Sequence, residues 1–238
     1  MICRMPNLFR RVCAAIAINA FAVLLGLIVN APADASPAHR PLCGTDHTAR
    51  AITKCVRAAL SDYWSGQLNQ VISEPVHIEA RKADVPRSCR PGIDSTPAFT
   101  CKANLSLYIN APLLHLIDKF IARGNRNYAF ATVQGHEMGH VLQYTLHQPQ
   151  IYKKHPTLRQ IRFVEQQADC LDGVWARHEI DAGRFDRHTF RHVAIRMIKL
   201  VSTNAEVQTH GTPHQRAVAL DRGLNHGRAQ ACNLVTFG

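Results

Sequence analysis

The sequence predicts a mainly helical α+β domain that carries a small sheet. Three observations support this prediction: several long segments have apolar residues at helical spacing, two short segments alternate apolar and polar residues, and no linker or repeat divides the chain after residue 35. About 200 residues remain after that point, which is enough for one domain with a sizeable core. We therefore expect a single domain over residues 36–238.

Residues 1–35 have the organisation of an export signal. A basic start is followed by the apolar segment Val12–Val29 and by the small-residue cleavage pattern Ala33-Asp34-Ala35. We expect the mature chain to begin at Ser36 and to be periplasmic or secreted. The alternative is an uncleaved, single-pass anchor that faces the exterior, because Val12–Val29 is near the lower length limit for a membrane span.

The first helix is expected from Thr45 to Trp64. Ile52, Val56 and Leu60 share one face of it, and Asp46 is suited to cap its start.

Two strands are expected on either side of a loop. Val76–Ala80 alternates apolar and polar residues, as does Leu105–Ile109, which we expect to be the strand that borders the cleft. The intervening segment Arg87–Thr100 contains Pro91-Gly92 and Pro97, so a loop is expected there. The remaining helices are expected over 111–123, 128–144, 163–176, 186–201 and 213–223, with a proline-containing linker through Pro149 and Pro156.

The central helix, Tyr128 to Tyr144, is apolar or small on nearly every side, which indicates burial. It nevertheless carries a polar group, His136-Glu137-x-x-His140. Helical spacing places the two histidines one turn apart on one face, where both imidazoles can bind one metal ion, and Glu137 lies about 100° round the helix. This pattern predicts a zinc site with Glu137 as the base.

A third ligand is expected from the helix over residues 163–176. Catalytic zinc sites have three protein ligands and one open position, and Glu165 can supply the third ligand. Asp169 lies one turn further on the same face, where its carboxylate can accept the free ring N–H of a liganding histidine. We expect Gln143, which lies one turn past His140, to support the ligands or the helix packing.

Four blocks of the sequence resemble the bacterial family of putative neutral zinc metallopeptidases, within the thermolysin-like group. The blocks are Cys89–Cys101 with Leu107-Tyr108-Ile109, then Gln134–Gln143, Val164–Ala176 and His210–Arg216. The resemblance implies a zincin-like fold with a small edge sheet beside the active-site helix, and a peptide or protein substrate. It also implies His136, His140 and Glu165 as zinc ligands and Glu137 as the catalytic residue.

A peptidase of this type needs a donor that stabilises the oxyanion formed on the attacked carbonyl. His210 and Tyr108 are both candidates, and the sequence does not rank them. The alternative function is a non-catalytic, zinc-stabilised binding protein of the cell envelope, although a purely structural site would have no use for Glu137.

The cysteine content agrees with export. Six cysteines remain after the signal segment, an even set that is compatible with 15 pairings in an oxidising compartment. Cys89–Cys101 brackets the predicted loop and is the first expected pair, and Cys43–Cys55 and Cys170–Cys232 follow by proximity and remainder. A second metal site is the other interpretation, but no C-x-x-C motif supports it.

The chain has a formal net charge of +11, which favours anionic partners. Its basic residues are scattered singly or in pairs, with little aromatic interleaving, so the sequence does not predict a nucleic-acid site. An exported basic protein that binds anionic polymers remains a further alternative. A membrane contact is expected only through the N-terminal segment, if it is uncleaved.

Overall fold

A computed structural model describes residues 41–44, 48–152 and 154–234 of the protein. All described elements lie in one compact unit, His39–Gly238. The predicted export segment and its cleavage site lie outside the described residues. Among the residues that are described, no helix is long and apolar enough to cross a membrane.

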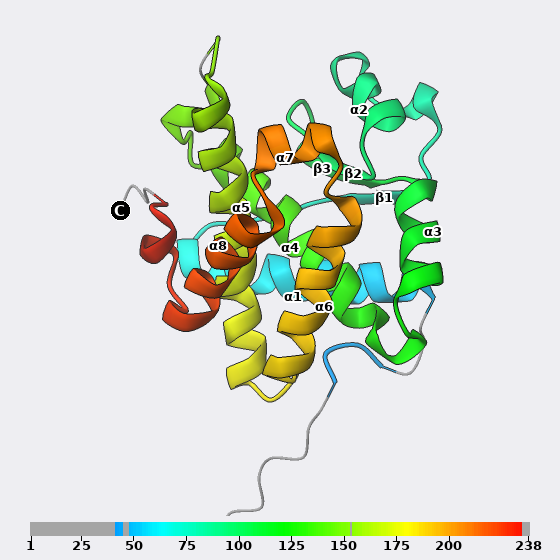
Figure 1. The fold of residues 1–238 in the computed structure, drawn as a ribbon, viewed down its shortest axis with the longest axis vertical. Helices are drawn as coiled ribbons and strands as arrows, with labels where there is room; N and C mark the ends of the chain where they lie inside the picture. Colours follow the sequence, from blue (N-terminus) through cyan, green and yellow to red (C-terminus); the bar gives the residue numbers. More distant parts are fainter. Residues whose placement is uncertain (1–40, 45–47, 153, 235–238) are drawn as a thin grey trace, which may run out of the picture. The chain divides into compact units, whose positions relative to one another are not determined.

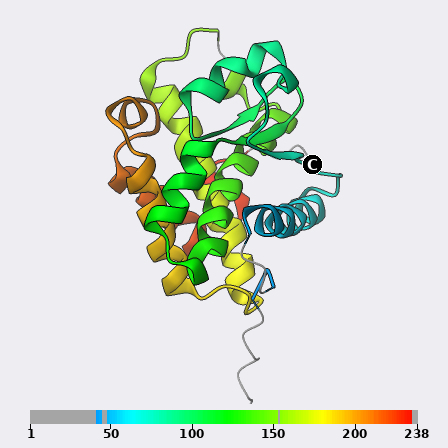
Figure 2. The ribbon, with the colours of Figure 1, turned by 90° about the vertical axis from the view of Figure 1, so that its right-hand side faces the viewer.

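The core is built from long helices. The described helices are α1 (Ala49–Leu68), α2 (Arg90–Ser95), α3 (Ala111–Phe120), α4 (Arg126–Thr145), α5 (Leu158–Asp181), α6 (Arg187–Val201), α7 (Asn204–His210) and α8 (Pro213–His226). Helix α4 packs against α1, α5 and α6, and Figure 2 shows α1 and α6 on opposite sides of it. The main apolar cluster fills the space between them, with Trp64, Trp175, Phe130 and Phe190 buried in it.

A small mixed sheet lies beside α4 (Figure 1). Its strands are β1 (Val76–Ile78), β2 (Ala98–Cys101) and β3 (Ser106–Ile109), in the order β1-β3-β2. β3 pairs parallel with β1 and antiparallel with β2. The structure therefore confirms a mainly helical α+β chain with a small sheet.

The roles of the two predicted strands need correction. β3 was expected to border the cleft, but it is the central strand and all of its residues are buried. The edge strand β2 packs on α4 and faces the cleft. The predicted loop Arg87–Thr100 instead contains α2 and most of β2, so that prediction was also wrong. Pro91 lies in the first turn of α2, where proline favours a helix because its missing N–H needs no partner there.

Other boundaries also differ from the prediction. α1 begins at Ala49 and is capped by Thr48, whose hydroxyl accepts a hydrogen bond from the Ala51 amide, so Asp46 is not the cap. Asp46 itself lies outside the described residues. α3 ends at Phe120 rather than Arg123. α7 was not predicted, and His210 is its last residue.

Three disulfides join cysteines within the described part of the chain, and they confirm the expected pairing. Cys43–Cys55 ties the chain to α1, Cys89–Cys101 joins the start of α2 to the end of β2, and Cys170–Cys232 links α5 to the segment after α8. Disulfides of this kind indicate an oxidising environment.

Close helix contacts at glycine bring α4, α5 and α8 together. A Cβ atom at Gly139 would lie 2.7 Å from the Cα atom of Ala168, and one at Gly223 would lie 1.9 Å from the carbonyl oxygen of Cys170. Only a residue without a side chain permits these approaches. As a result, α5 lies close enough to α4 for Glu165 to reach the two histidines.

Candidate metal centre

The candidate metal centre lies where α4, α5 and the end of α7 meet. His136 and His140 project from α4, Glu165 projects from α5, and His210 ends α7. The Nε2 atoms of the three histidines lie 3.4 Å, 3.2 Å and 3.0 Å, in that order, from the Oε2 atom of Glu165. Four potential ligands therefore converge on one point.

The donor set fits a metal ion. Oε2 of Glu165 is buried and has no partner with hydrogen-bond geometry among the described residues, although three ring nitrogens surround it. A carboxylate oxygen and imidazole nitrogens are the ligands that zinc prefers. A cation placed among these atoms would bind the Glu165 oxygen and the ring nitrogens together. Hydrogen bonds within the described part of the protein leave that oxygen without a partner.

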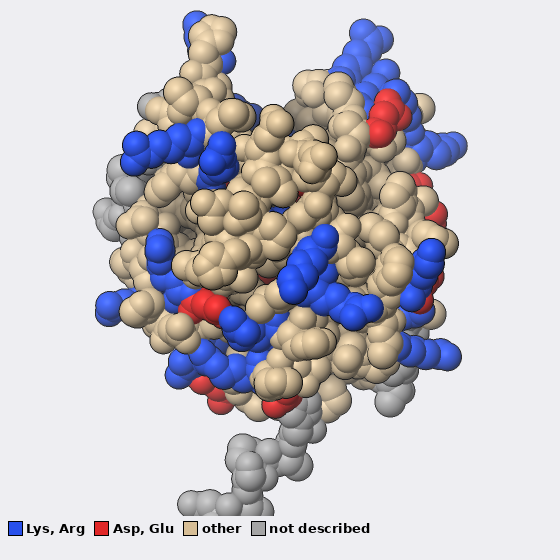
Figure 3. Space-filling view, viewed as in Figure 1, with Lys and Arg blue, Asp and Glu red and all other residues tan. Residues whose placement is uncertain are grey.

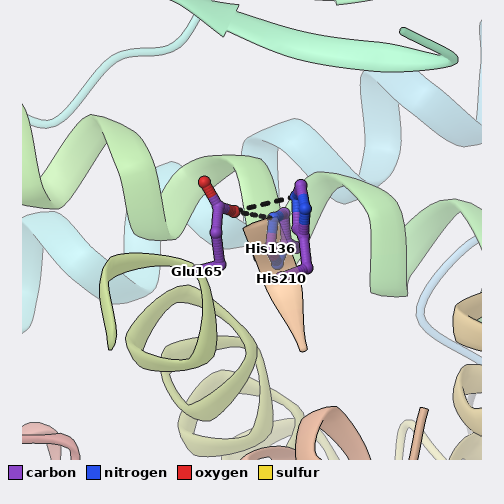
Figure 4. Close-up of side chains that lie close together, drawn as sticks. All are labelled: His136, Glu165 and His210. Atoms are coloured by element: carbon purple, nitrogen blue, oxygen red, sulfur yellow. Dashed lines mark ion pairs between the residues drawn. The ribbon is translucent and has the colours of Figure 1, made fainter. Parts of the chain in front are cut away.

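The tightest group of three is not the predicted one. The ligand atoms of His136, Glu165 and His210 all lie within 4.8 Å of one another, and Figure 4 shows the three side chains pointing toward each other. His140 lies outside this group but is as close to Glu165 as the others are. The structure thus brings the three predicted ligands together and adds His210 to them.

The charges in the cluster stabilise one another. Burial disfavours the charged form of His140, but the Glu165 carboxylate outweighs it and raises the pKa of His140 to about 9. Burial likewise opposes charge on His210, whereas the adjacent carboxylates of Glu165 and Glu206 raise its pKa to about 10. Burial tends to raise the pKa of Glu165, but His140 and the other imidazoles hold it well below its usual range. In the metal-free protein, the rings of His140 and His210 are therefore in the cationic form at neutral pH.

A buried network orients His136. Its Nδ1 atom donates to Oδ1 of Asp169 at 2.9 Å, and Arg216 on α8 donates two hydrogen bonds to the same carboxylate, at 2.9 Å and 2.8 Å. Burial works against the ionised form of Asp169, but Arg216 and His136 hold its pKa well below the usual range. The carboxylate stays charged and fixes the His136 tautomer that leaves Nε2 free for a metal.

A second network orients His140. Its Nδ1 atom donates to Oε1 of Gln143 at 2.9 Å. The Gln143 amide donates in turn to the Val164 carbonyl and to Gln167, at 2.8 Å and 3.0 Å, and Gln167 donates to the carbonyl of Cys232. Asp169 and Gln143 thus each hold one ring, in the positions that the sequence indicated.

Glu137 lies apart from the ligands and faces the sheet. The hydroxyl of Thr100 on β2 donates to its Oε2 atom at 2.8 Å and also lies 3.1 Å from its backbone carbonyl oxygen. β2 therefore positions the carboxylate that the sequence singled out as the base.

The two oxyanion candidates have different surroundings. His210 lies in the cluster, and Glu206, one helical turn earlier, holds its Nδ1 atom at 2.8 Å. Tyr108 is buried in the second apolar cluster with Val85 and Cys101, its hydroxyl accepts a hydrogen bond from Asn104, and it does not line the cavity. We assign Tyr108 no role in the site.

A comparison with models of protein families shows which family the chain belongs to. The family model for "Putative neutral zinc metallopeptidase" matches residues 14–237. The chain belongs to this family. The resemblance drawn from the four sequence blocks is thereby confirmed at the level of the family.

Relatives of this metallopeptidase chain include the uncharacterized protein YpfJ of Escherichia coli K12 and its counterpart in Escherichia coli O6:H1. Each is 25% identical over 237 residues, which covers 90% of this chain and 80% of the relative. No solved structure matches the chain. Zinc is the cofactor of the family, and the His/Glu/His group described above can hold it.

The candidate metal centre opens into a cavity of about 390 Å³. His136, Glu137, His140, Glu165 and His210 all line it. One wall is apolar and comes from α3, α4 and α6, with Leu113, Val133, Met197, Ile198 and Val201. Tyr144, Ile151, Pro156, Ile161 and Val164 also line the cavity, so much of the surface around the candidate metal centre is apolar.

No role was assigned from the sequence to Thr100, Arg216 and Glu206, which contact residues of the site, or to Glu74, which interacts electrostatically with Glu137. Arg216 is the last residue of the fourth sequence block that resembles the family, and this was the one feature of the sequence that pointed to a role for it. Glu74 is fully buried and neither carboxylate oxygen has a hydrogen-bond partner among the described residues. Its pKa is raised well above the usual range, first by burial and then by Glu137.

Proposed function

We propose that the protein is an exported zinc-dependent endopeptidase that hydrolyses peptide bonds. The observation that carries this proposal is the convergence of His136, His140 and Glu165 on one point, with the separate carboxylate of Glu137 on the same cavity. Two nitrogen ligands, one carboxylate ligand and an adjacent base are the parts that metal-assisted hydrolysis requires.

His136, His140 and Glu165 would hold the zinc ion. When bound, zinc lowers the pKa of a bound water to about 7 and polarises the scissile carbonyl. Glu137 accepts a proton from the attacking water as the water oxygen bonds to the carbonyl carbon. The same residue then delivers this proton to the amine as the C–N bond breaks.

His210 is suited to hold the oxyanion. In the metal-free protein its pKa is raised to about 10 against the opposing effect of burial, so there Nε2 carries a proton that it can donate. Glu206 binds the other ring nitrogen and fixes the orientation of the ring. A cationic donor aimed at the cavity stabilises negative charge as it develops on the attacked carbonyl.

A second candidate function rests on the position of His210. If His210 bound zinc together with His136, His140 and Glu165, the site would have four protein ligands and no open position, as in structural zinc sites. The protein would then be a non-catalytic, zinc-stabilised binding protein of the cell envelope.

Three variants separate the two functions. If the protein is an endopeptidase, Glu137→Gln should retain zinc and no longer cleave casein. His210→Ala should also retain zinc, with kcat lowered by roughly 100-fold or more. Glu165→Ala should lose zinc. Metal content and cleavage would be measured on the same purified samples. A Glu137→Gln protein that cleaves at the wild-type rate would overturn the role of Glu137. Loss of zinc from His210→Ala, with no activity in the wild type, would establish the structural site instead.

A further inference from the structure

The outer face of α6 is basic along its length. His188, Arg191, His192, Arg196 and Lys199 recur at spacings of three and four residues, so they share one side of the helix, and all five are exposed. No aspartate or glutamate occurs between Arg187 and Val201. Figure 3 shows lysine and arginine side chains over α6 on this side of the molecule.

These side chains enclose a hollow rather than lying on a flat surface. The hollow has a volume of about 280 Å³ and is lined by the five residues together with Ile195. The rings of His188 and His192 stack at one end of it, with centroids 6.4 Å apart. A concave basic surface favours a ligand that inserts acidic side chains between the cations.

Only part of this charge is neutralised within the protein. Arg191 is held by Asp221 on α8 through two hydrogen bonds, at 2.7 Å and 2.8 Å. Arg196 and Lys199 have no ion-pair or hydrogen-bond partner in the described part of the chain. Two cations next to the hollow are therefore available to an anionic partner.

The same helix forms a wall of the catalytic cavity. Met197, Ile198 and Val201 on its inner face line the cavity, whereas Arg196 and Lys199 lie on its outer face. A polypeptide that leaves the cavity over the edge of α6 would meet these cations. The basic hollow is thus placed to bind a substrate segment that lies outside the cleavage site.

We propose that the outer face of α6 is an exosite that binds an acidic stretch of the protein substrate. This inference rests on the proposed endopeptidase function and adds a substrate class to it. A lipid surface is the less suitable partner, because α6 exposes no large apolar side chain for insertion into a bilayer. Attraction between opposite charges would increase the rate of association and weaken as salt is added.

The test measures binding separately from cleavage. The full chain with Glu137→Gln is titrated with a fluorescent peptide of ten glutamates, and then with vesicles of phosphatidylglycerol. We expect the pair Arg196→Glu and Lys199→Glu to weaken peptide binding by about tenfold at low salt. The matched control is Arg50→Glu with Lys54→Glu on α1, which changes the net charge equally on the side of α4 away from α6, and it should weaken binding by less than about twofold (Figure 2).

Three results would overturn the exosite: no binding of the peptide, equal losses in both pairs, or loss of vesicle binding alone in the α6 pair. A cleavage assay of the active protein follows, with one apolar peptide made with and without an acidic tail. The tail should lower KM for the wild type and not for the α6 pair, while kcat stays unchanged. If neither peptide is cleaved, the endopeptidase proposal fails. The exosite on α6 is judged separately, from the binding measurements.

Discussion

Arg216 and Asp169 form a buried, two-bonded ion pair between α8 and α5, directly behind the candidate metal centre. The pair is more than a link between two helices, because Asp169 also accepts the ring N–H of His136. Each charge is taken out of water and depends on the other for compensation. The position of one histidine in the site therefore depends on a guanidinium group from a different helix.

Removing this guanidinium should be costly. Arg216→Met leaves Asp169 as a buried charge without its main partner, so we expect a loss of about 3–5 kcal/mol in the free energy of unfolding. Zinc affinity should fall by roughly 10- to 100-fold as His136 loses its orientation. Urea unfolding and zinc titration measure the two effects. The control is Arg191→Met, which removes an exposed ion pair with Asp221 and should cost less than about 1 kcal/mol.

Zinc binding should release protons. Against the opposing effect of burial, the Glu165 carboxylate raises the pKa of the ligand His140 to about 9, so both of its ring nitrogens are protonated at pH 7 in the metal-free protein. A ligand nitrogen must give up its proton to bind the ion, and zinc affinity should therefore rise with pH between pH 6 and 9. Calorimetric titrations in buffers of different ionisation enthalpy count the protons. An observed heat that is the same in every buffer would contradict this expectation.

Thr100 should matter for catalysis without contributing to metal binding. Its hydroxyl donates to the Glu137 carboxylate, so Thr100→Val leaves this carboxylate free to rotate away from the cavity. We expect kcat to drop about tenfold, with unchanged zinc content and a similar KM. Thr100→Ser keeps the hydroxyl and serves as the control, and its kcat should be close to that of the wild type.

Glu74 should make the protein less stable as the pH rises. Its pKa is raised by burial and by Glu137, so above the pKa of the unfolded state the folded state binds more protons than the unfolded state does. The free energy of unfolding should then fall with increasing pH, until the raised pKa is passed. Glu74→Gln removes this slope, and the difference between the two proteins should grow by up to roughly 1.4 kcal/mol per pH unit. Parallel curves from pH 4.5 to 8 in urea unfolding would show that Glu74 ionises freely.

The sequence predicted the parts of the site that depend on local spacing. His136 and His140 recur one helical turn apart, and Glu165 and Asp169 do so on the next long helix, so each pair was assigned to one helical face. The cysteines paired as expected because two of the pairs are close in the sequence and the third was the remainder. These features need no knowledge of how the helices pack.

The sequence did not predict parts of the site that depend on contacts between distant segments. Thr100 acts through β2, which was taken for a loop because proline and glycine precede it. Glu74 is a single charged residue between two elements, and nothing local distinguishes it from a solvated residue. His210 was a candidate oxyanion donor from the sequence, but its place beside Glu165 depends on α7, a helix of seven residues that is too short to show clear periodicity.

The Cys170–Cys232 disulfide has a consequence for the timing of assembly. It joins the residue next to Asp169 to a segment near the carboxyl terminus, and Gln167 donates to the carbonyl of Cys232 in the same place. His210 and Arg216 also come from the last part of the chain. A partly synthesised chain that ends before α7 holds His136 and His140 without the residues that complete their surroundings. The centre can therefore be completed only when α4, α5, α7 and α8 have all been synthesised, and the disulfide then joins α5 to the segment that follows α8.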